Sequence, residues 1–289
     1  MPQPAWKKLR GRISAIGRQT PAQVLHHNDQ DLVHEFRMGD PLYLERFGYK
    51  VYSQNDEDGI IAEIFRRIGD TDRRFVEFGV GIGLESNSHF LLHKGWSGLW
   101  IEANSEVCKD IRTAFAGPLE AGQLTLLNAF VDKDNINDLI AVQGGISGSI
   151  DMLSIDIDGN DYWIWSVISS VQARVVVIEY NAKFPPDFEW VLSYNDKHNW
   201  QGGDEYGASL KALEVLGRRL GYRLVATCYR GVNAFFVRED LCGSQFPEPA
   251  TAENLYNPCR FSVFDLRYIS GHESKRYIGG RLPPASARR

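Results

Sequence analysis

The sequence of 289 residues lacks any apolar run close to the roughly 20 residues that cross a bilayer, which predicts no transmembrane segment. It also has little cysteine. The four cysteines (108, 228, 242 and 259) are scattered, without the close pairs of a zinc site or redox motif. The sequence also lacks excess positive charge. Its net charge is -5, which argues against general nucleic-acid binding. We therefore expect a cytoplasmic protein with reduced thiols.

The composition, with 43% hydrophobic and 24% charged residues, is typical of a soluble globular protein. A chain of this length can bury one large core. We expect one catalytic domain over residues 51–240, a helical cap over 1–50, and an extension over 241–289 that ends in a frayed tail. Basic residues near the start predict a solvated amphipathic helix over 1–20.

A short apolar segment followed by alternating glycines organises the sequence. Residues 75–78 are apolar apart from Glu77, which predicts a buried strand. Gly79 and Gly81 begin the glycine run, which allows a tight turn under a flat or charged ligand. Glu102 ends the next apolar run, where its carboxylate could accept hydrogen bonds from both hydroxyls of a ribose.

Two ligand classes compete for this glycine loop. A dinucleotide fingerprint needs its third glycine three positions after the second, and Leu84 stands there instead. The loop together with Glu102 is similar to the nucleoside loop of class I S-adenosylmethionine-dependent methyltransferases. A nicotinamide enzyme is the weaker alternative.

Acidic residues follow a predicted strand over residues 150–155. Asp156, Asp158 and Asp161 fall within six residues, and their repulsion must be offset by a cation, protons or water. A calcium loop of the EF-hand type needs Gly at its sixth position and Glu at its twelfth, where Asp161 and Val167 stand. We expect Asp161 to cap the helix that follows.

The next strand, residues 174–178, is almost wholly apolar, as a central parallel strand should be. Ligands of doubly wound sheets bind beyond the carboxyl ends of the strands. Asp156, Asp158, Glu179 and Asn181 are therefore expected to meet there. Oxygen ligands of this kind suit Mg²⁺, Mn²⁺ or Ca²⁺ better than zinc.

Residues 182–207 form a long connection rich in aromatic and acidic side chains. It is either a surface that stacks on a sugar or a lid whose aromatic rings pack on the domain itself. His198 within it is a candidate base or ligand. Two strands over 222–229 and 232–237, joined by a tight turn, predict an antiparallel hairpin at the end of the sheet.

From about Tyr52 to Val237 the chain resembles the FkbM-like branch of S-adenosylmethionine-dependent methyltransferases. The resemblance lies in residues 53–58, 76–81, 100–102 and 154–159. It implies the Rossmann-like class I methyltransferase fold, an α/β fold with a seven-stranded, mostly parallel sheet, a C-terminal antiparallel hairpin and helices on both faces. It also implies methyl transfer to a hydroxyl of a sugar, glycan or secondary metabolite.

The resemblance further implies where ligands bind. Cofactor contacts are expected from Gln54, Glu77, Gly79, Gly81, Ser86, Asn87, Glu102, Asn104, Asp132 and Asp156. Glu57 is expected near the methionine end of the cofactor, and Val131 beside the adenine. The site also looks like that of divalent-cation-dependent O-methyltransferases, which implies that Asp156, Glu179 and Asn181 hold Mg²⁺ or Mn²⁺. Asp158 or His198 would then remove the proton of the acceptor hydroxyl.

Two other interpretations remain open. One is a metal-independent methyltransferase in which Asp158 is the base. The other is a non-catalytic nucleoside-binding protein of the same fold. The expected partner is a small-molecule or glycan acceptor, and the sequence leaves homo-oligomerisation open.

Overall fold

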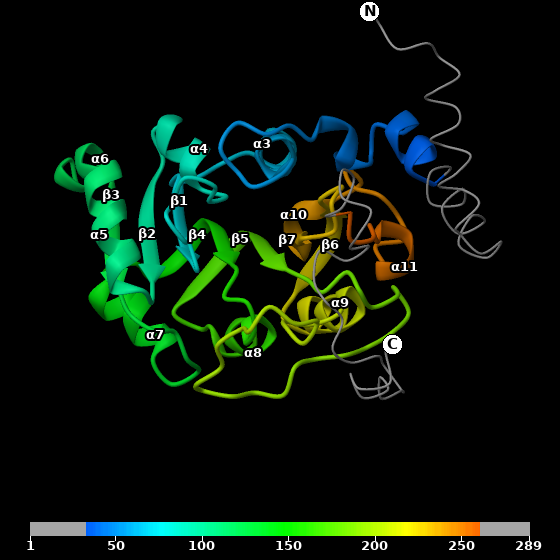
Figure 1. Cartoon of the computed structure of the whole chain (residues 1–289). Coiled ribbons are helices and arrows are strands. Elements are labelled where there is room, and N and C mark those ends of the chain that lie inside the picture. The colour runs from blue at the N-terminus through cyan, green and yellow to red at the C-terminus, as the bar shows by residue number, and fades with distance from the viewer. Residues whose placement is uncertain (1–32, 261–289) are drawn as a thin grey trace, which may run out of the picture.

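The computed structural model of the chain describes residues 33–260. Its seven strands form one sheet in the order β3-β2-β1-β4-β5-β7-β6 (Figure 1). The strands are β1 Arg74–Phe78, β2 Ser97–Glu102, β3 Leu124–Asn128, β4 Gly148–Ile155, β5 Val171–Glu179, β6 Tyr222–Thr227 and β7 Asn233–Arg238. β1 to β5 pair in parallel, whereas β7 is antiparallel to both β5 and β6. This is the Rossmann-like class I methyltransferase arrangement that the sequence predicts.

Helices cover both faces of the sheet (Figure 1). Their bounds are α3 Glu57–Ile68, α4 His89–His93, α5 Ser105–Ala114, α6 Ala116–Glu120, α7 Ile136–Asp138, α8 Asp161–Val167, α9 Leu210–Arg219, α10 Glu239–Cys242 and α11 Ala252–Leu255. Residues 33–39 and Leu44–Phe47 are also helical. The predicted helix over 1–20 and the tail beyond 260 lie outside the described residues. Within the described part of the chain, no helix is long and apolar enough to span a membrane.

The core has one layer on each side of the sheet. Neighbouring residues of β1 belong to different layers: Phe75 lies in the cluster that holds residues of α3 and α4, whereas Val76 lies in the cluster that holds residues of α7, α8 and α9. β5 is buried on both faces, as its continuous apolar sequence predicts. The sheet is therefore held from both sides, and the carboxyl ends of its parallel strands share one edge.

The acidic stretch over residues 53–58 fastens α3 to the rest of the domain. Asp58 Oδ2 accepts hydrogen bonds from the backbone N–H groups of residues 51–53 at 2.7 to 2.9 Å. Glu57 is fully buried and accepts from the Asn55 N–H and from Asn233 Nδ2 of β7 at 2.6 and 3.1 Å. The carboxylates thus bind the preceding loop and the hairpin.

A side chain of this stretch caps the start of α3, because Ser53 Oγ accepts a hydrogen bond from the Asp58 N–H at 3.1 Å. Asp56 is the N-cap residue, yet its side chain makes no capping hydrogen bond. Its two oxygens instead accept from the Tyr229 N–H at 3.2 and 3.1 Å. Burial is the main cause that raises the pKa of Asp56 to about 6, from 3.8. The carboxylate therefore carries its charge at a cost to the folded state.

Replacing Asp56 by asparagine is expected to stabilise the protein at alkaline pH. The amide oxygen can still accept from Tyr229, but no charge is buried. A raised pKa means that the folded chain binds the proton more tightly, so the native protein loses stability as the pH rises through the window from about 4 to about 6. The variant should gain about 1–3 kcal/mol at about pH 8 in urea unfolding, and less near pH 5. A variant less stable than the native protein at both pH values would contradict this account.

Candidate active site

A cavity of about 390 Å³ lies at the carboxyl edge of the sheet. Its walls come from the segments that follow β1, β2, β3 and β4 and from the loop over residues 182–207. The lining residues are Gly79, Gly81, Ile101, Glu102, Ala103, Asn104, Val107, Ala129, Phe130, Val131, Asp156, Ile157, Asp158, Asn160, His198, Asn199 and Trp200. Parallel strands bring these segments together although they are distant in the sequence.

The glycine loop and the acid that ends β2 are in direct contact. Glu102 Oε2 accepts a hydrogen bond from the Gly81 N–H at 3.1 Å, and Oε1 accepts from the Asn104 N–H at 2.8 Å. The Asn104 side chain in turn caps α5. A carboxylate is thus fixed at the cavity wall beside a chain reversal that leaves room for a ligand.

Gly79, directly after β1, lies against the backbone that follows β4. Its φ of +75° is in the left-handed region. A Cβ atom at this position would lie 1.4 Å from the carbonyl oxygen of Asp156, inside bonding distance. The close approach of these two strand ends therefore requires glycine, and it sets the first acid of the next loop against the cavity.

The cavity brings together half of the site residues that the sequence predicts. Those that line it are Gly79, Gly81, Glu102, Asn104, Asp156, Asp158 and His198, whereas Gln54, Glu77, Ser86, Asn87, Asp132, Glu179 and Asn181 are not among its lining residues. Glu179 nevertheless lies within the carboxylate cluster described below. The others have different surroundings.

Glu77 is a structural tie between β1 and α4. Its oxygens accept from the N–H groups of Asn87 and Ser88 at 2.8 and 3.0 Å and from Ser154 Oγ at 3.2 Å. Burial raises the pKa of Glu77. The Asn87 side chain donates to the same Ser154 Oγ at 3.1 Å, and Ser86 is buried next to it. These residues hold the start of α4 and do not form the cavity wall.

Gln54 and Asp132 also lie away from the cavity. Gln54 is exposed, and its carbonyl accepts from Lys50 Nζ at 3.1 Å. Asp132 Oδ1 accepts from the N–H groups of residues 134 and 135, both at 2.8 Å, which closes the turn after β3. Its neighbours Phe130 and Val131 line the cavity instead. Phe130 was missed from the sequence, although it directly precedes a predicted contact.

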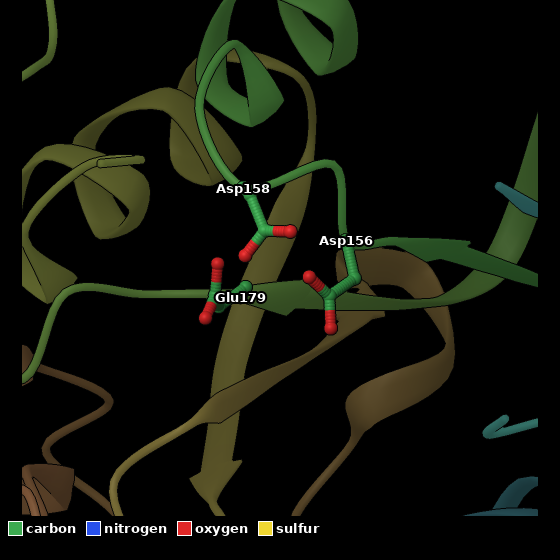
Figure 2. Close-up of side chains that lie close together, drawn as sticks. All are labelled: Asp156, Asp158 and Glu179. Carbon is green, nitrogen blue, oxygen red and sulfur yellow. The ribbon is translucent and has the colours of Figure 1, made fainter. Parts of the chain in front are cut away.

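Three carboxylates meet beyond the ends of β4 and β5. Asp156, Asp158 and Glu179 each present an oxygen within 4.8 Å of the others, and Figure 2 shows the three groups facing one another. Glu179 is 9% exposed, and its Oε2 is buried without a hydrogen-bond partner. Such an arrangement requires a cation, a proton or a donor from a ligand.

The electrostatics of the cluster have the same implication. Burial, followed by repulsion from Asp158 and Asp161, raises the pKa of Asp156 well above its usual value. Burial and then repulsion from Asp156 raise the pKa of Glu179 likewise. Oxygen ligands with this much negative charge fit Mg²⁺ or Mn²⁺, and the unpartnered Glu179 oxygen is available as a ligand atom.

Asp161 holds the turn that carries Asp158. The sequence predicts that Asp161 caps α8, and this is wrong because its carboxylate accepts from the N–H groups of Ile157 and Gly159 at 2.8 and 2.9 Å. The N-cap residue of α8 is Asn160. Burial raises the pKa of Asp161. The side chain thus points back into the acidic turn and fixes it.

His198 reaches the same turn from the long loop. Its Nε2 lies 3.1 Å from the carbonyl oxygen of Asp158. A carbonyl oxygen only accepts hydrogen bonds, so Nε2 carries the hydrogen. This nitrogen therefore does not take a proton from an acceptor, and in the neutral ring the lone pair lies on Nδ1.

Asn181 anchors the long loop. It is fully buried, and its Nδ2 donates to the carbonyl oxygens of Asp204 and Tyr206 at 2.8 and 3.1 Å. Its Oδ1 accepts from the Lys183 N–H at 3.2 Å. The third carboxylate of the cluster is that of Asp158. The hydrogen bonds of Asn181 hold the long loop.

Several aromatic rings of the long loop pack on one another or are buried in the protein. Trp190 stacks on Phe184 with ring centroids 4.4 Å apart, and Tyr206 is only 3% exposed. Trp200 lines the cavity, with its Nε1 donating to the Gly203 carbonyl oxygen at 2.9 Å. One aromatic ring therefore remains available to a ligand in the cavity wall.

No protein-family model matches the chain, and no curated protein matches it significantly. Among solved structures, it is similar to a proposed caffeoyl-CoA O-methyltransferase from Staphylococcus aureus, with 14% identity, coverage of 74% of this chain and 95% of that one, and a TM-score of 0.41. It is also similar to the glycopeptide N-methyltransferase MtfA with S-adenosyl-L-homocysteine, with 14% identity, coverage of 68% of this chain and 95% of that one, and a TM-score of 0.40. For the N-terminal domain of EvdMO1 with the same compound, the identity is 12%, the coverage is 73% of this chain and 94% of that one, and the TM-score is 0.38. None of these matches singles out the FkbM-like branch.

Proposed function

We propose that the chain is an S-adenosylmethionine-dependent O-methyltransferase of the FkbM-like kind, assisted by a divalent cation. Its acceptor is a hydroxyl of a sugar, glycan or secondary metabolite. The observation that carries the proposal is the position of Glu102, whose Oε2 lies 3.1 Å from the Gly81 N–H in the wall of the same cavity that Asp156 and Asp158 line. The acid assigned to the nucleoside and two members of the carboxylate cluster thus line one cavity.

The cofactor end of the cavity is assigned to the segments after β1, β2 and β3. Glu102 would accept from the ribose hydroxyls, since a carboxylate has acceptor capacity beyond its two backbone bonds. Phe130 and Val131 offer apolar surface for the adenine. The reacting end would then lie toward Asp156, next to Gly79.

The cation is assigned to Asp156, Asp158 and Glu179, whose charge and unpartnered oxygen fit Mg²⁺ or Mn²⁺. Such an ion, when bound, lowers the pKa of an acceptor hydroxyl. The methyl group would pass from the sulfonium to the acceptor oxygen and leave S-adenosylhomocysteine, and Asp158 would take the hydroxyl proton. Asp158 is suited to this because it is the exposed member of the cluster. The protein otherwise positions the reactants and excludes water.

Glu102→Ala is the variant that tests the cofactor assignment. Loss of a charged double acceptor should weaken S-adenosylhomocysteine binding by about 10- to 100-fold in titration calorimetry. Glu106→Ala is the matched control, because this exposed acid of α5 pairs with Lys109 at 2.7 Å, is not a cavity residue, and should leave the affinity unchanged. Native protein that does not bind S-adenosylhomocysteine, or equal affinities for both variants, would reject the proposed function.

A further inference from the structure

We propose that His198 is a positioning residue, which couples closure of the loop over the cofactor cavity to assembly of the carboxylate cluster. The inference rests on the proposed function. The loop segment over residues 195–200 is called the strap below. It passes over the turn that carries Asp158, and three of its residues line the cavity, namely His198, Asn199 and Trp200.

The first step is that the backbone of Asp158 is held in an unfavourable conformation. Its φ is +55°, a backbone angle that residues other than glycine rarely adopt. Asp161 binds the N–H groups on both sides of it, at residues 157 and 159. His198 Nε2 binds its carbonyl oxygen. These contacts offset the strain and point the carboxylate toward Glu179 (Figure 2).

The second step is that the His198 ring lies directly on the same turn. A Cβ atom on Gly159 would lie 2.1 Å from His198 Cδ2 and 2.6 Å from Nε2. Only glycine leaves room for the ring at this distance. The His198 ring therefore packs directly on Gly159, and any side chain at position 159 must displace the ring.

The third step is that the strap is fastened at a second point close by. Asn160 Nδ2 donates to the Asn195 carbonyl oxygen at 2.7 Å, and the Asn195 N–H donates to Asn160 Oδ1 at 3.4 Å. The His198 N–H also binds the Asn195 carbonyl oxygen, at 2.9 Å. Contacts with the strap therefore gather on residues 158–160, the part of the acidic loop that presents Asp158.

Coupling follows from these contacts. A ligand in the cavity touches the strap and favours its closed position, in which His198 holds Asp158 in its strained conformation. That conformation completes the carboxylate cluster, so the cofactor should strengthen cation binding. Linkage requires the effect to be equal in the other direction.

The experiment measures Mn²⁺ affinity by calorimetry or electron paramagnetic resonance, with and without saturating S-adenosylhomocysteine. In the native protein, S-adenosylhomocysteine should lower the Mn²⁺ dissociation constant by about 5- to 50-fold, and Mn²⁺ should lower that of S-adenosylhomocysteine by the same factor. In His198→Ala and Gly159→Ala the factor should fall to about 1. His198→Gln retains an N–H donor and should restore part of the coupling.

His93→Ala is the control, because this exposed histidine of α4 is not among the cavity residues and should keep the native coupling. Circular dichroism checks that each variant is folded. If the native protein binds both probes but neither changes the affinity of the other, the role of His198 is wrong while the proposed function stands. If His198→Ala weakens Mn²⁺ binding equally in both conditions, the coupling is likewise rejected. Native protein that binds neither probe would instead reject the proposed function.

Discussion

An Asp156→Asn protein should bind S-adenosylhomocysteine with an affinity close to native, yet lose Mn²⁺ binding and methyl transfer by at least about 100-fold. The substitution removes one of the three charges that face one another beyond β4 and β5. It is nearly isosteric, and it relieves the repulsion that helps to raise the pKa of Glu179, so the fold should not be weakened. Calorimetry gives both affinities, and mass spectrometry follows the methylation of any acceptor that the native protein modifies.

Asp134→Asn is the matched control for this variant, since Asp134 is exposed and is not a cavity residue. Excess chelator on the native protein should reproduce the loss of methyl transfer. Native activity that survives both the chelator and the Asp156→Asn change would remove the cation from the mechanism. The interpretation with Asp158 as a metal-independent base would then replace it.

Gly79→Ala should have the largest effect on folding. The added Cβ atom would overlap the Asp156 carbonyl oxygen at 1.4 Å and approach its carbon at 2.6 Å, and both are backbone atoms that cannot rotate away. The ends of β1 and β4 must therefore separate. We expect a loss of at least about 3 kcal/mol in urea unfolding together with loss of S-adenosylhomocysteine binding.

Gly81→Ala is the comparison that separates crowding from backbone strain. Gly81 also has a positive φ, of +53°, but no atom lies within 4 Å of an added Cβ. The cost should be about 1–2 kcal/mol, from the left-handed conformation alone. Equal losses in the two variants would show that the contact with Asp156 does not determine the need for glycine at position 79.

The sheet could be predicted from the sequence because buried parallel strands are continuous apolar runs, and β5 is the clearest case. The boundaries were less predictable. Apolar residues continue to Val131, but β3 ends at Asn128. Val131 is apolar because it packs in the core, at 6% exposure, and the segment after Asn128 turns to form the cavity wall. Hydrophobicity records burial and does not distinguish it from strand pairing.

The site was predictable where an acid stands at the very end of a strand. Glu102 and Glu179 are the last residues of β2 and β5, and Asp156 is the first residue after β4, so topology alone brings them to one edge. Glu77 lies one residue inside the end of β1, and its side chain turns to α4 instead. A difference of one position thus separates an acid at the carboxyl edge of the sheet from one that ties two elements together.

The partners of side chains in turns and loops could not be predicted. Asp161 and Asn181 have the residue types and positions of a cap and a metal ligand, yet one binds back into its own turn and the other holds a loop. Trp200 enters the cavity wall because the loop over 182–207 folds back across the turn after β4, where Asn160 binds the Asn195 carbonyl oxygen. Such contacts depend on a loop path that has no periodic pattern in the sequence.

The order of the strands also has a consequence for biosynthesis. β7 is the last strand of the sheet to be translated, yet it lies between β5 and β6 and pairs with residues 175–179 of β5. While the ribosome is still making residues 180–232, that apolar edge has no partner in the nascent chain. A messenger cut short before Asn233 would therefore yield a product with an open, aggregation-prone edge, a natural target for chaperones.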